Sequence, residues 1–240
     1  VDRGFIGHKS AKMMKRAKAT ENRQNKIIEQ KSALLKDNEQ TFKLKIENLE
    51  YRKRNFIQIS DLQIEYDNTP ICKPINLYVN QGDRILIDGK NGCGKSSLLK
   101  IILKQSSNYI GTLNIPNDLI ISYISQSYDT LQGSITDFAK DSKIDEALFR
   151  AILDKMGFEK QNYNINMQYL SAGQKKKILI AKSLSQKAHL YVWDEPLNYL
   201  DIFSRIQLEE LLSEYSPTMI FVEHDTAFQN LIATKIYKIE

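Results

Sequence analysis

Cysteine and histidine are scarce in this sequence, which has two cysteines, Cys72 and Cys93, and three histidines among 240 residues. No cluster of these residues has the spacing of a zinc site, so a zinc-stapled fold is excluded. A disulfide is not expected either, because Cys93 lies inside the glycine-rich segment described below, where a disulfide would block function. We therefore expect the chain to work in a reducing compartment.

Long apolar runs are also missing. No stretch approaches the roughly 20 consecutive apolar residues that cross a bilayer, and the N-terminus lacks the apolar core of a signal peptide. These absences predict a cytoplasmic chain with no integral membrane segment. The chain begins at Val1 rather than Met, inside charged sequence, so we expect it to be a piece of a longer protein.

The charge is unevenly distributed along the chain. The formal net charge is +5, but residues 1–55 hold 15 basic and 7 acidic side chains (net +8), and residues 56–240 hold 19 and 22 (net −3). The 42% of hydrophobic residues is enough for one sizeable core or for a domain with an appendage. The positive surplus therefore belongs to the first quarter alone.

That first quarter favours a long helix. Residues 9–39 contain no Gly or Pro and are rich in Lys, Gln, Glu and Ala. Residues 15–26 have almost no apolar face, so this part must lie in water, against another helix or on an anionic partner. Its basic side chains can neutralise the phosphates of folded RNA. The alternative is a solvated helix, or one strand of a coiled coil, whose charges only keep it soluble.

From residue 42 onward the pattern changes to that of an α/β domain. Strand-like runs cover residues 42–46 and 56–66, with a charged turn at 51–55 between them. Apolar segments then alternate with candidate helices, the former at 84–88, 120–125, 189–194 and 218–223 and the latter at 95–104, 144–156, 172–186 and 202–215. This alternation predicts a largely parallel central sheet preceded by an antiparallel portion.

The segment Gly89-Lys90-Asn91-Gly92-Cys93-Gly94-Lys95-Ser96-Ser97 follows an apolar strand and opens a helix, the context of a phosphate-binding loop. Its backbone N–H groups would wrap the phosphates of a ligand, Lys95 would neutralise their β/γ oxygens, and Ser96 would place a hydroxyl on Mg²⁺. By chance such a string arises in about one chain in a hundred of this length. The alternative is a plain glycine-rich turn.

A second candidate element is the pair Asp194-Glu195, which ends the apolar run 190–193. In a parallel sheet the carboxyl ends of the strands form the ligand-binding edge. Asp194 would hold Mg²⁺, and Glu195, pointing the other way, could accept a proton from the attacking water. Together with the phosphate loop, this pair predicts a nucleoside triphosphatase.

Between these elements, Leu170-Ser171-Ala172-Gly173-Gln174 resembles the Leu-Ser-Gly-Gly-Gln signature of the ABC ATPases and departs from it by one methyl group at position 172. The family's other landmarks follow in order. They are Tyr66, 29 residues before Lys95, for the adenine-stacking aromatic; Gln126, 31 residues after it, for the Q-loop; residues 198–201 for the D-loop; and His224 for the switch histidine. Singly, Tyr66 could be a core tyrosine, Gln126 a surface amide and His224 a satisfied strand-end histidine.

The resemblance implies a P-loop NTPase fold of ABC type, with a mixed central sheet, an antiparallel β subdomain and a helical signature subdomain at about residues 127–175. It implies catalytic roles for Glu195, His224, Gln126 and Lys95, and a magnesium site at Ser96, Gln126 and Asp194. ATP would contact Tyr66 and the loop residues Gly89, Asn91, Gly92, Cys93, Gly94, Lys95, Ser96 and Ser97. The residues Ser171, Gly173 and Gln174 would act on ATP held by a second ABC domain, with Asp201 at the interface.

That second domain would lie in the same full-length chain, or would come from a second copy in a homodimer. The run His8 to Lys18 resembles the helical linker between the two domains of ABC-F proteins, which implies domains at residues 1–40 (partial linker) and 41–240. ABC-F proteins lack membrane domains and act on the ribosome, contacting rRNA and tRNA.

The string Leu170 to Lys182, together with residues 193–199 and 221–225, is similar to the Vga/Lsa-like antibiotic-resistance branch of that subfamily. Members of that branch protect ribosomes from lincosamides, streptogramin A and pleuromutilins. The alternative is the ATP-binding subunit of a membrane transporter. A DNA-repair ATPase fits less well, because only 74 residues separate Lys95 from Leu170 and no zinc-ligand cluster lies among them. The lysines 175–177 could touch RNA, although exposed helix positions are the simpler interpretation.

Overall fold

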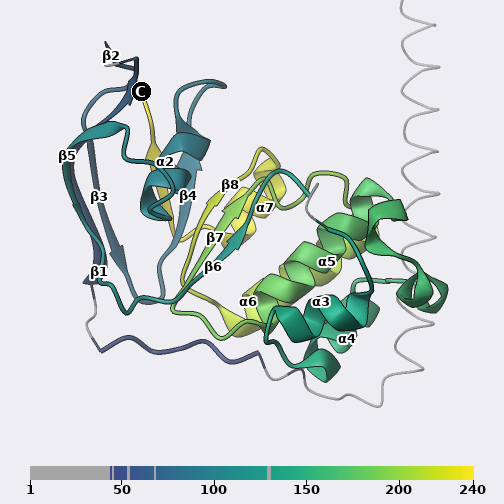
Figure 1. Cartoon of the computed structure of the whole chain (residues 1–240). Helices are drawn as coiled ribbons and strands as arrows, with labels where there is room; N and C mark the ends of the chain where they lie inside the picture. Colours follow the sequence, from purple (N-terminus) through teal and green to yellow (C-terminus); the bar gives the residue numbers. More distant parts are fainter. Residues whose placement is uncertain (1–43, 45, 53–54, 68, 129–130) are drawn as a thin grey trace, which may run out of the picture. The chain divides into compact units, whose positions relative to one another are not determined.

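The computed structural model describes residues 44, 46–52, 55–67, 69–128 and 131–240. The helix expected over residues 9–39 lies outside these residues. Within them the chain forms two β-sheets and a set of helices (Figure 1), which is the α/β architecture that the sequence predicts. None of the helices in this part of the chain is long and apolar enough to span a bilayer.

The first sheet is antiparallel and is built around one long strand. β1 (Asn55–Tyr66) pairs with β2 (Thr69–Pro70), with β3 (Ile75–Asn80) and with β5 (Tyr109–Asn114). Hydrophobic residues alternate along β1 and β3, so one face of this sheet is buried and the other is exposed. The strand β1 ends at Tyr66, which places that residue at the site described below.

The second sheet is parallel, and among the described residues its strand order is β6-β7-β8-β4-β9. The strand bounds are β4 (Arg84–Asp88), β6 (Ile121–Ile124), β7 (Leu190–Asp194), β8 (Met219–Val222) and β9 (Lys235–Lys238). β7 and β8 are buried at every position, as expected for a sheet that is covered on both faces. The carboxyl ends of these strands meet at one edge, where functional loops begin.

Alternate residues of the parallel strands enter two separate cores. On one face, Leu190 and Val192 of β7 pack with the antiparallel sheet and with α2 (Lys95–Ile102), which lies between the two sheets (Figure 1). On the other face, Tyr191 and Trp193 pack with the remaining helices. Successive side chains of a strand point to opposite faces of the sheet, so the parallel sheet contributes residues to both cores.

The second core is covered by helices of the later part of the chain. These are α3 (Ile135–Asp141), α4 (Glu146–Lys155), α5 (Ala172–Ser185), α6 (Ile202–Tyr215) and α7 (Thr226–Ile232). Two short 3₁₀ turns, η1 (Lys160–Asn164) and η2 (Met167–Tyr169), lead from α4 into α5. Side-chain oxygens cap the first turns of α3, α4, α5, α6 and α7, which fixes where each helix begins.

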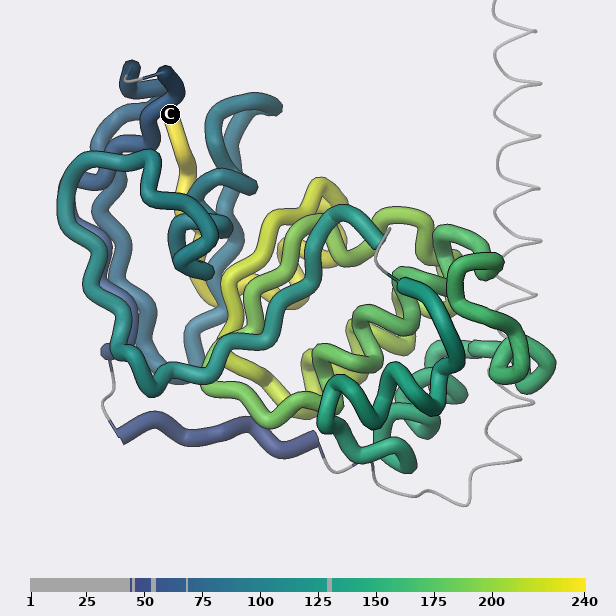
Figure 2. Tube along the Cα trace, in the orientation of Figure 1, coloured from purple at the N-terminus to yellow at the C-terminus, as the bar shows by residue number. Residues whose placement is uncertain are grey.

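The strand predicted at residues 42–46 is wrong for its described residues, because neither Leu44 nor Ile46 belongs to a strand. The described residues between 44 and 52 instead form an extended segment, here called the strap, that runs beneath the parallel sheet (Figure 2). Ile46 is buried in the second core, so its apolar character serves packing rather than strand pairing.

Hydrogen bonds fix the strap at the amino-terminal edge of that sheet. The Leu49 N–H donates to the Ala188 carbonyl at 3.0 Å, next to the start of β7, and the Asn48 amide donates to the Tyr215 carbonyl at 2.8 Å, at the end of α6. The Tyr51 hydroxyl donates to Asp118 at 2.6 Å. The strap therefore lies at the end of the strands opposite to the edge where the functional loops begin.

Candidate functional site

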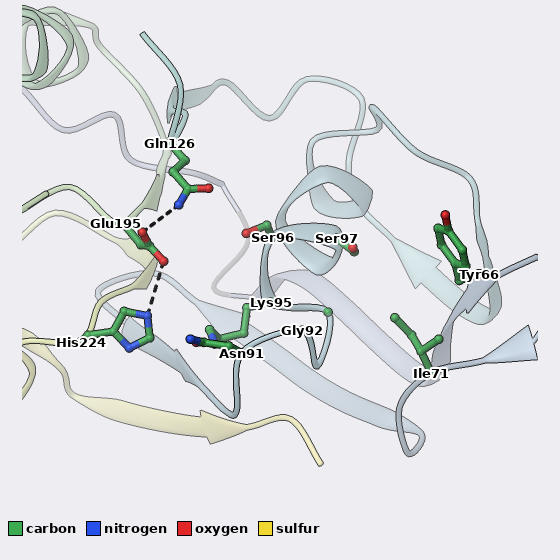
Figure 3. A pocket seen from close by; sticks show the side chains of 11 residues that line it. Tyr66, Ile71, Asn91, Gly92, Lys95, Ser96, Ser97, Gln126, Glu195 and His224 are labelled. Atoms are coloured by element: carbon green, nitrogen blue, oxygen red, sulfur yellow. Dashed lines mark hydrogen bonds and ion pairs between the residues drawn. The ribbon is translucent and has the colours of Figure 1, made fainter. Parts of the chain in front are cut away.

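Four loops that follow β4, β6, β7 and β8 surround a cavity of about 750 Å³ (Figure 3). All four leave the parallel sheet at its carboxyl edge, the position at which α/β proteins bind ligands. The lining residues are Tyr66, Ile71, Asn91, Gly92, Gly94, Lys95, Ser96, Ser97, Gln126, Glu195 and His224. Most of the residues expected from the sequence to touch ATP are thus brought to one place.

The glycine-rich loop after β4 has the conformation that its sequence demands. Gly94, at the N-cap of α2, has φ 99°, and a Cβ there would lie 2.8 Å from the Cδ1 atom of Ile64. The Lys95 ammonium donates to the carbonyls of Gly89 and Lys90, at 2.8 and 3.1 Å, and is thereby folded back over the loop. The start of α2 and this ammonium together form an anion-binding cradle.

A carboxylate, Glu195, lies at one end of the cavity, with the side chains of Gln126 and His224 beside it (Figure 3). Its Oε2 atom accepts hydrogen bonds from the amides of Gln126, at 2.9 Å, and Asn198, at 2.5 Å. Its Oε1 atom lies 3.4 Å from Nε2 of His224. Gln126 is therefore more than an isolated surface amide, since it orients the carboxylate.

The neighbouring carboxylate, Asp194, is almost fully buried beneath the cavity, with 3% of its surface exposed. Burial raises the pKa of Asp194, and the nearby Glu195 charge adds to this effect, whereas the Ser96 hydroxyl opposes it. The Oδ1 atom of Asp194 has no hydrogen-bond partner among the residues that the structure describes. A buried oxygen of this kind is suited to a cation.

These residues fit Mg²⁺ rather than a metal held by the protein alone. In the described part of the chain, no group of three or more His, Cys, Asp or Glu residues has the arrangement of a metal site. Mg²⁺ in nucleotide sites needs only one or two carboxylates, because substrate phosphates and water supply the other oxygens. Asp194, with the Ser96 hydroxyl and the Gln126 amide oxygen, offers such a donor set.

The opposite end of the cavity is aromatic and apolar (Figure 3). Tyr66 is 70% exposed and Ile71 is 42% exposed, so the alternative of a core tyrosine at position 66 is excluded. An exposed ring beside an aliphatic side chain offers a surface on which a flat base can stack. Ile71 was not foreseen from the sequence, because it belongs to no motif.

The signature residues Ser171, Gly173 and Gln174 do not line this cavity. The Ser171 hydroxyl accepts a hydrogen bond from the Gln174 N–H while the Gln174 side chain accepts one from the Ser171 N–H, so the two form a capping box at the start of α5. A Cβ on Gly173 would lie 2.7 Å from the Tyr199 carbonyl oxygen, so the D-loop packs too closely for any other residue to fit unshifted. Ala172 is half-buried, and its extra methyl group is accommodated there.

The interpretation of lysines 175–177 as exposed helix positions is wrong for two of them. Lys176 is fully buried and Lys177 is 8% exposed. The Lys176 ammonium donates to the Ser125 carbonyl at 3.3 Å, and Lys177 pairs with Asp201 at 2.9 Å. Burial lowers the pKa of Lys176, while the carboxylates of Asp194, Glu223 and Glu195 oppose this effect. Neither side chain is free to touch RNA.

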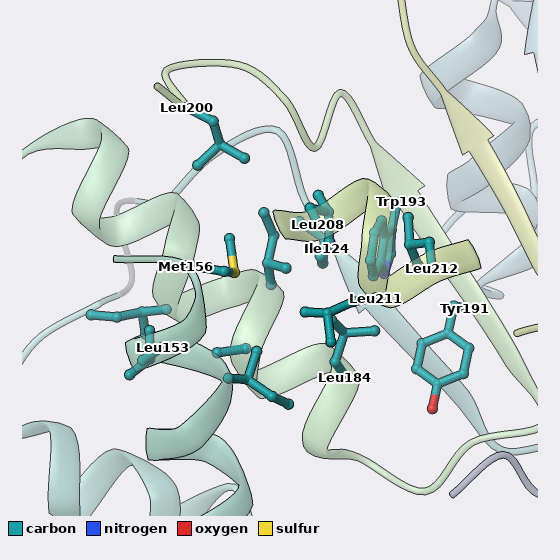
Figure 4. Packing of buried hydrophobic residues seen from close by; sticks show 14 of the residues in the cluster. Ile124, Leu153, Met156, Leu184, Tyr191, Trp193, Leu200, Leu208, Leu211 and Leu212 are labelled. Atoms are coloured by element: carbon teal, nitrogen blue, oxygen red, sulfur yellow. The ribbon is translucent and has the colours of Figure 1, made fainter. Parts of the chain in front are cut away.

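The strand that carries Asp194 is held rigidly by its neighbours. Trp193, the residue before Asp194, is fully buried in the second core among leucines of α6 (Figure 4). Its indole N–H donates to the Ser183 hydroxyl of α5 at 2.9 Å. Packing and this hydrogen bond together fix the position at which β7 ends and the two carboxylates begin.

A phosphate loop that opens a helix, a buried carboxylate beside its serine and a second carboxylate at the rim define a P-loop nucleotide-binding protein. Among such proteins the family can be identified directly. The family model described as "ABC transporter" matches residues 72–198, and the chain belongs to this family, as one of its ATP-binding domains. Homologous domains of the family are ATPases.

Two curated relatives illustrate the similarity. "Probable ATP-binding protein YbiT" of Escherichia coli O157:H7 is 32% identical over 192 residues, which cover 78% of this chain and 36% of YbiT. "ABC transporter F family member 2" of Arabidopsis thaliana is 29% identical over 194 residues, covering 78% and 28%. The chain therefore spans about a third of the length of these relatives.

Among solved structures, a chain named "RNase-L Inhibitor" matches with a TM-score of 0.65 at 22% identity, covering 80% of this chain and 38% of that chain. At this identity the likeness concerns the fold alone. It agrees with the α/β architecture of sheets and helices described above.

Besides Ile71, two residues at the site had no assigned role in the sequence-based interpretation. Asn198, within the expected D-loop, donates to Glu195, and the signal for it was its place three residues beyond that carboxylate. Glu223, directly before His224, is 5% exposed and accepts hydrogen bonds from two loops. A buried carboxylate next to an expected switch histidine was the signal that could have revealed it.

Proposed function

We propose that this chain is the ATP-binding and ATP-hydrolysing domain of an ABC-F protein that acts on the ribosome. The proposal that this domain hydrolyses ATP rests on the position and the hydrogen bonds of Glu195. Its carboxylate faces the cavity, is oriented by Gln126 and Asn198, and lies beside His224. A held carboxylate at the phosphate end of a nucleotide cavity is what abstraction of a proton from water requires.

Each lining residue then has a distinct task. Tyr66 stacks on adenine, while Lys95 and the backbone N–H groups of residues 89–97 hold the phosphates. Asp194, Ser96 and Gln126 hold Mg²⁺, which neutralises charge on the phosphate oxygens when bound. Glu195 accepts the proton of the attacking water, and His224 contacts the terminal phosphate. The nucleotide enters as MgATP and leaves as ADP and phosphate.

The signature residues act on a different nucleotide. Because Ser171, Gly173 and Gln174 lie outside the cavity, we assign them to ATP bound by a second ABC domain, in the same full-length chain or in a second copy of this one. The start of α5 would direct its partial positive charge at the terminal phosphate of that ATP. We assign residues 41–240 to this ATPase domain, residues 127–175 to its helical subdomain, and residues 1–40 to a linker.

Hydrolysis by the chain alone tests this division. We expect the 240-residue chain to bind MgATP weakly and to hydrolyse little, because no opposing signature completes its cavity. Turnover per chain should rise with concentration if two copies substitute for the missing partner. Robust hydrolysis that does not depend on concentration, by a chain shown to be monomeric, would contradict the assignment.

The ribosome is proposed from the resemblance to ABC-F proteins and from the similarity to a relative named as a family F member. We expect the intact protein, in the cytoplasm, to sediment with ribosomes when ATP is present and to lose this association as salt is raised. Protection of translation from a lincosamide would place it in the resistance branch. Recovery with a membrane subunit, and absence from ribosomes, would support the transporter alternative.

A further inference from the structure

Glu223 is buried at the point where the loops after β7 and β8 separate. It directly follows the last residue of β8, is 5% exposed and does not line the nucleotide cavity. Its carboxylate is therefore enclosed by protein. A buried carboxylate requires hydrogen-bond donors around it, and their identity shows what it holds together.

The donors come from both loops. The Oε1 atom accepts from the Leu197 N–H at 2.8 Å, in the loop that carries Glu195, and the Oε2 atom accepts from the His224 N–H at 2.7 Å. The backbone carbonyl of Glu223 also accepts from the amide of Gln229 in α7, at 2.6 Å. The Glu223 side chain thus bridges the loops that follow β7 and β8, at a point where these loops form no sheet hydrogen bond with each other.

The sequence explains why a side chain is needed here. The parallel ladder ends where the Glu195 N–H donates to the Val222 carbonyl at 3.0 Å. Pro196 then has no N–H to donate, so the next available donor is Leu197, which the Glu223 carboxylate satisfies. Glu195 itself has φ 49°, a left-handed conformation that persists only when its surroundings hold it.

Within the described part of the chain, Glu223 makes no direct ion pair. Burial lowers the pKa of Lys176, which is fully buried in α5, and the charges of Asp194, Glu223 and Glu195 oppose this effect. The ammonium is bonded to the Ser125 carbonyl beside Gln126 rather than to Glu223. Both oxygens of Glu223 thus remain available to Leu197 and His224.

We propose that Glu223 is a positioning residue for hydrolysis, whose carboxylate fixes the Glu195 loop against the His224 backbone and so sets the distance between those two side chains. That distance is 3.4 Å in this structure (Figure 3). The inference rests on the proposed roles of Glu195 and His224. Because Glu223 touches no nucleotide, its loss should slow turnover and leave binding of MgATP unchanged.

The test compares Glu223→Gln with Glu210→Gln in the intact protein. Gln keeps the size of the side chain but places an NH₂ group against one of the two N–H donors. We expect Glu223→Gln to lower kcat by about ten- to a hundredfold, the scale of a small misplacement of reacting groups, with the Kd for MgATP unchanged within about twofold. Glu210 is an exposed glutamate of α6, and its Gln variant should keep wild-type kinetics.

A double variant separates positioning from general damage. In the Glu195→Gln background, Glu223→Gln should lower the residual turnover by less than about threefold, because the group that it positions is already absent. An equal fold-loss in both backgrounds would overturn the proposal. If Glu223→Gln does not fold, Glu223→Asp replaces it, since it keeps the charge but cannot reach both donors.

These outcomes distinguish a failure of the proposed function from a failure of the role proposed for Glu223. Wild-type turnover in Glu195→Gln would remove the proposed function itself. Slow turnover in Glu195→Gln with wild-type turnover in Glu223→Gln and Glu223→Asp would remove only the positioning role.

Discussion

The cavity and the surface at the start of α5 are both nucleotide-binding regions in our proposal, but they are built very differently. Four loops enclose the cavity, and its charged groups are held by hydrogen bonds to and from residues of these loops. The α5 surface is one helix start, with Ser171 exposed and its side chain occupied by the capping box. It offers a helix dipole and a hydroxyl, but no enclosure.

This difference indicates that the two regions perform different steps. The cavity has the groups for base stacking, phosphate binding, cation binding and proton abstraction. The α5 surface can add only a few contacts to a phosphate that something else already holds. Binding and catalysis should therefore respond separately to changes in the two regions, and the following predictions test that separation.

The largest effect is expected for Glu195→Gln in the intact protein. The amide cannot accept the proton of water, so kcat should fall by at least about a hundredfold while MgATP binding is kept. Single-turnover hydrolysis and equilibrium binding measure the two quantities. Turnover at the wild-type rate would show that the cavity does not use this carboxylate.

A smaller effect, which starts from the other region, is expected for Gly173→Ala. The new Cβ would approach the Tyr199 carbonyl oxygen to 2.7 Å and displace the D-loop or the start of α5. Hydrolysis in the intact protein should fall by about tenfold, on the scale of weakening one phosphate contact, with unchanged binding of MgATP to the cavity. The control is Ala172→Gly, which removes one methyl group next door and should stay within about twofold of wild type.

Nucleotide affinity should respond to the aromatic end of the cavity. Tyr66→Ala removes the exposed ring and should weaken MgATP binding by roughly five- to tenfold, the usual worth of an aromatic stacking contact. Tyr66→Phe keeps the ring and should bind normally. Tyr78, which is also exposed but lies outside the cavity, supplies the matched control, and equal losses in Tyr66→Ala and Tyr78→Ala would argue against stacking.

The smallest effect concerns the stability of the chain without nucleotide. The pKa of Asp194 is raised by burial, so its contribution to stability falls as the pH rises from its ordinary pKa to the raised one, and the cost is kept at every higher pH. Asp194→Asn should therefore raise the apo melting temperature by a few degrees, at roughly 2–4 °C per kcal/mol. It should also abolish stabilisation by MgATP, whereas the exposed Asp141→Asn should change neither quantity.

The sequence predicted the motif residues around the cavity better than it predicted the residues that depend on contacts between distant segments. Residues of the phosphate loop, Asp194-Glu195 and His224 belong to motifs at strand ends, and a parallel sheet brings all strand ends to one edge. β4 and α6 have the predicted bounds, because an apolar run and a capping aspartate mark them locally. Ile71 and Glu223 depend on contacts between distant segments, which no local spacing encodes.

The errors have a common physical cause. Lys176 and Lys177 were expected to be exposed because lysine is seldom buried, yet α5 is enclosed by neighbours on most of its circumference, and the two ammonium groups find a carbonyl and a carboxylate. Leu44 and Ile46 alternate as in a strand, but the strap pairs with loop and helix-end groups instead of a neighbouring strand. For the strap, the apolar character was interpreted correctly but the kind of partner was not, whereas for the two lysines the burial itself was not predicted.

The strap has a mechanical consequence. It is bonded next to the start of β7, whereas Asp194 ends the same strand, four residues and about 13 Å from its first residue. An extended strand that is buried along its whole length resists stretching, so a pull that reaches the strap is transmitted along β7 as displacement rather than absorbed. The coupling also acts in the opposite direction. A shift of Asp194 and Glu195 on closing around a phosphate would move the strap at the other end of β7.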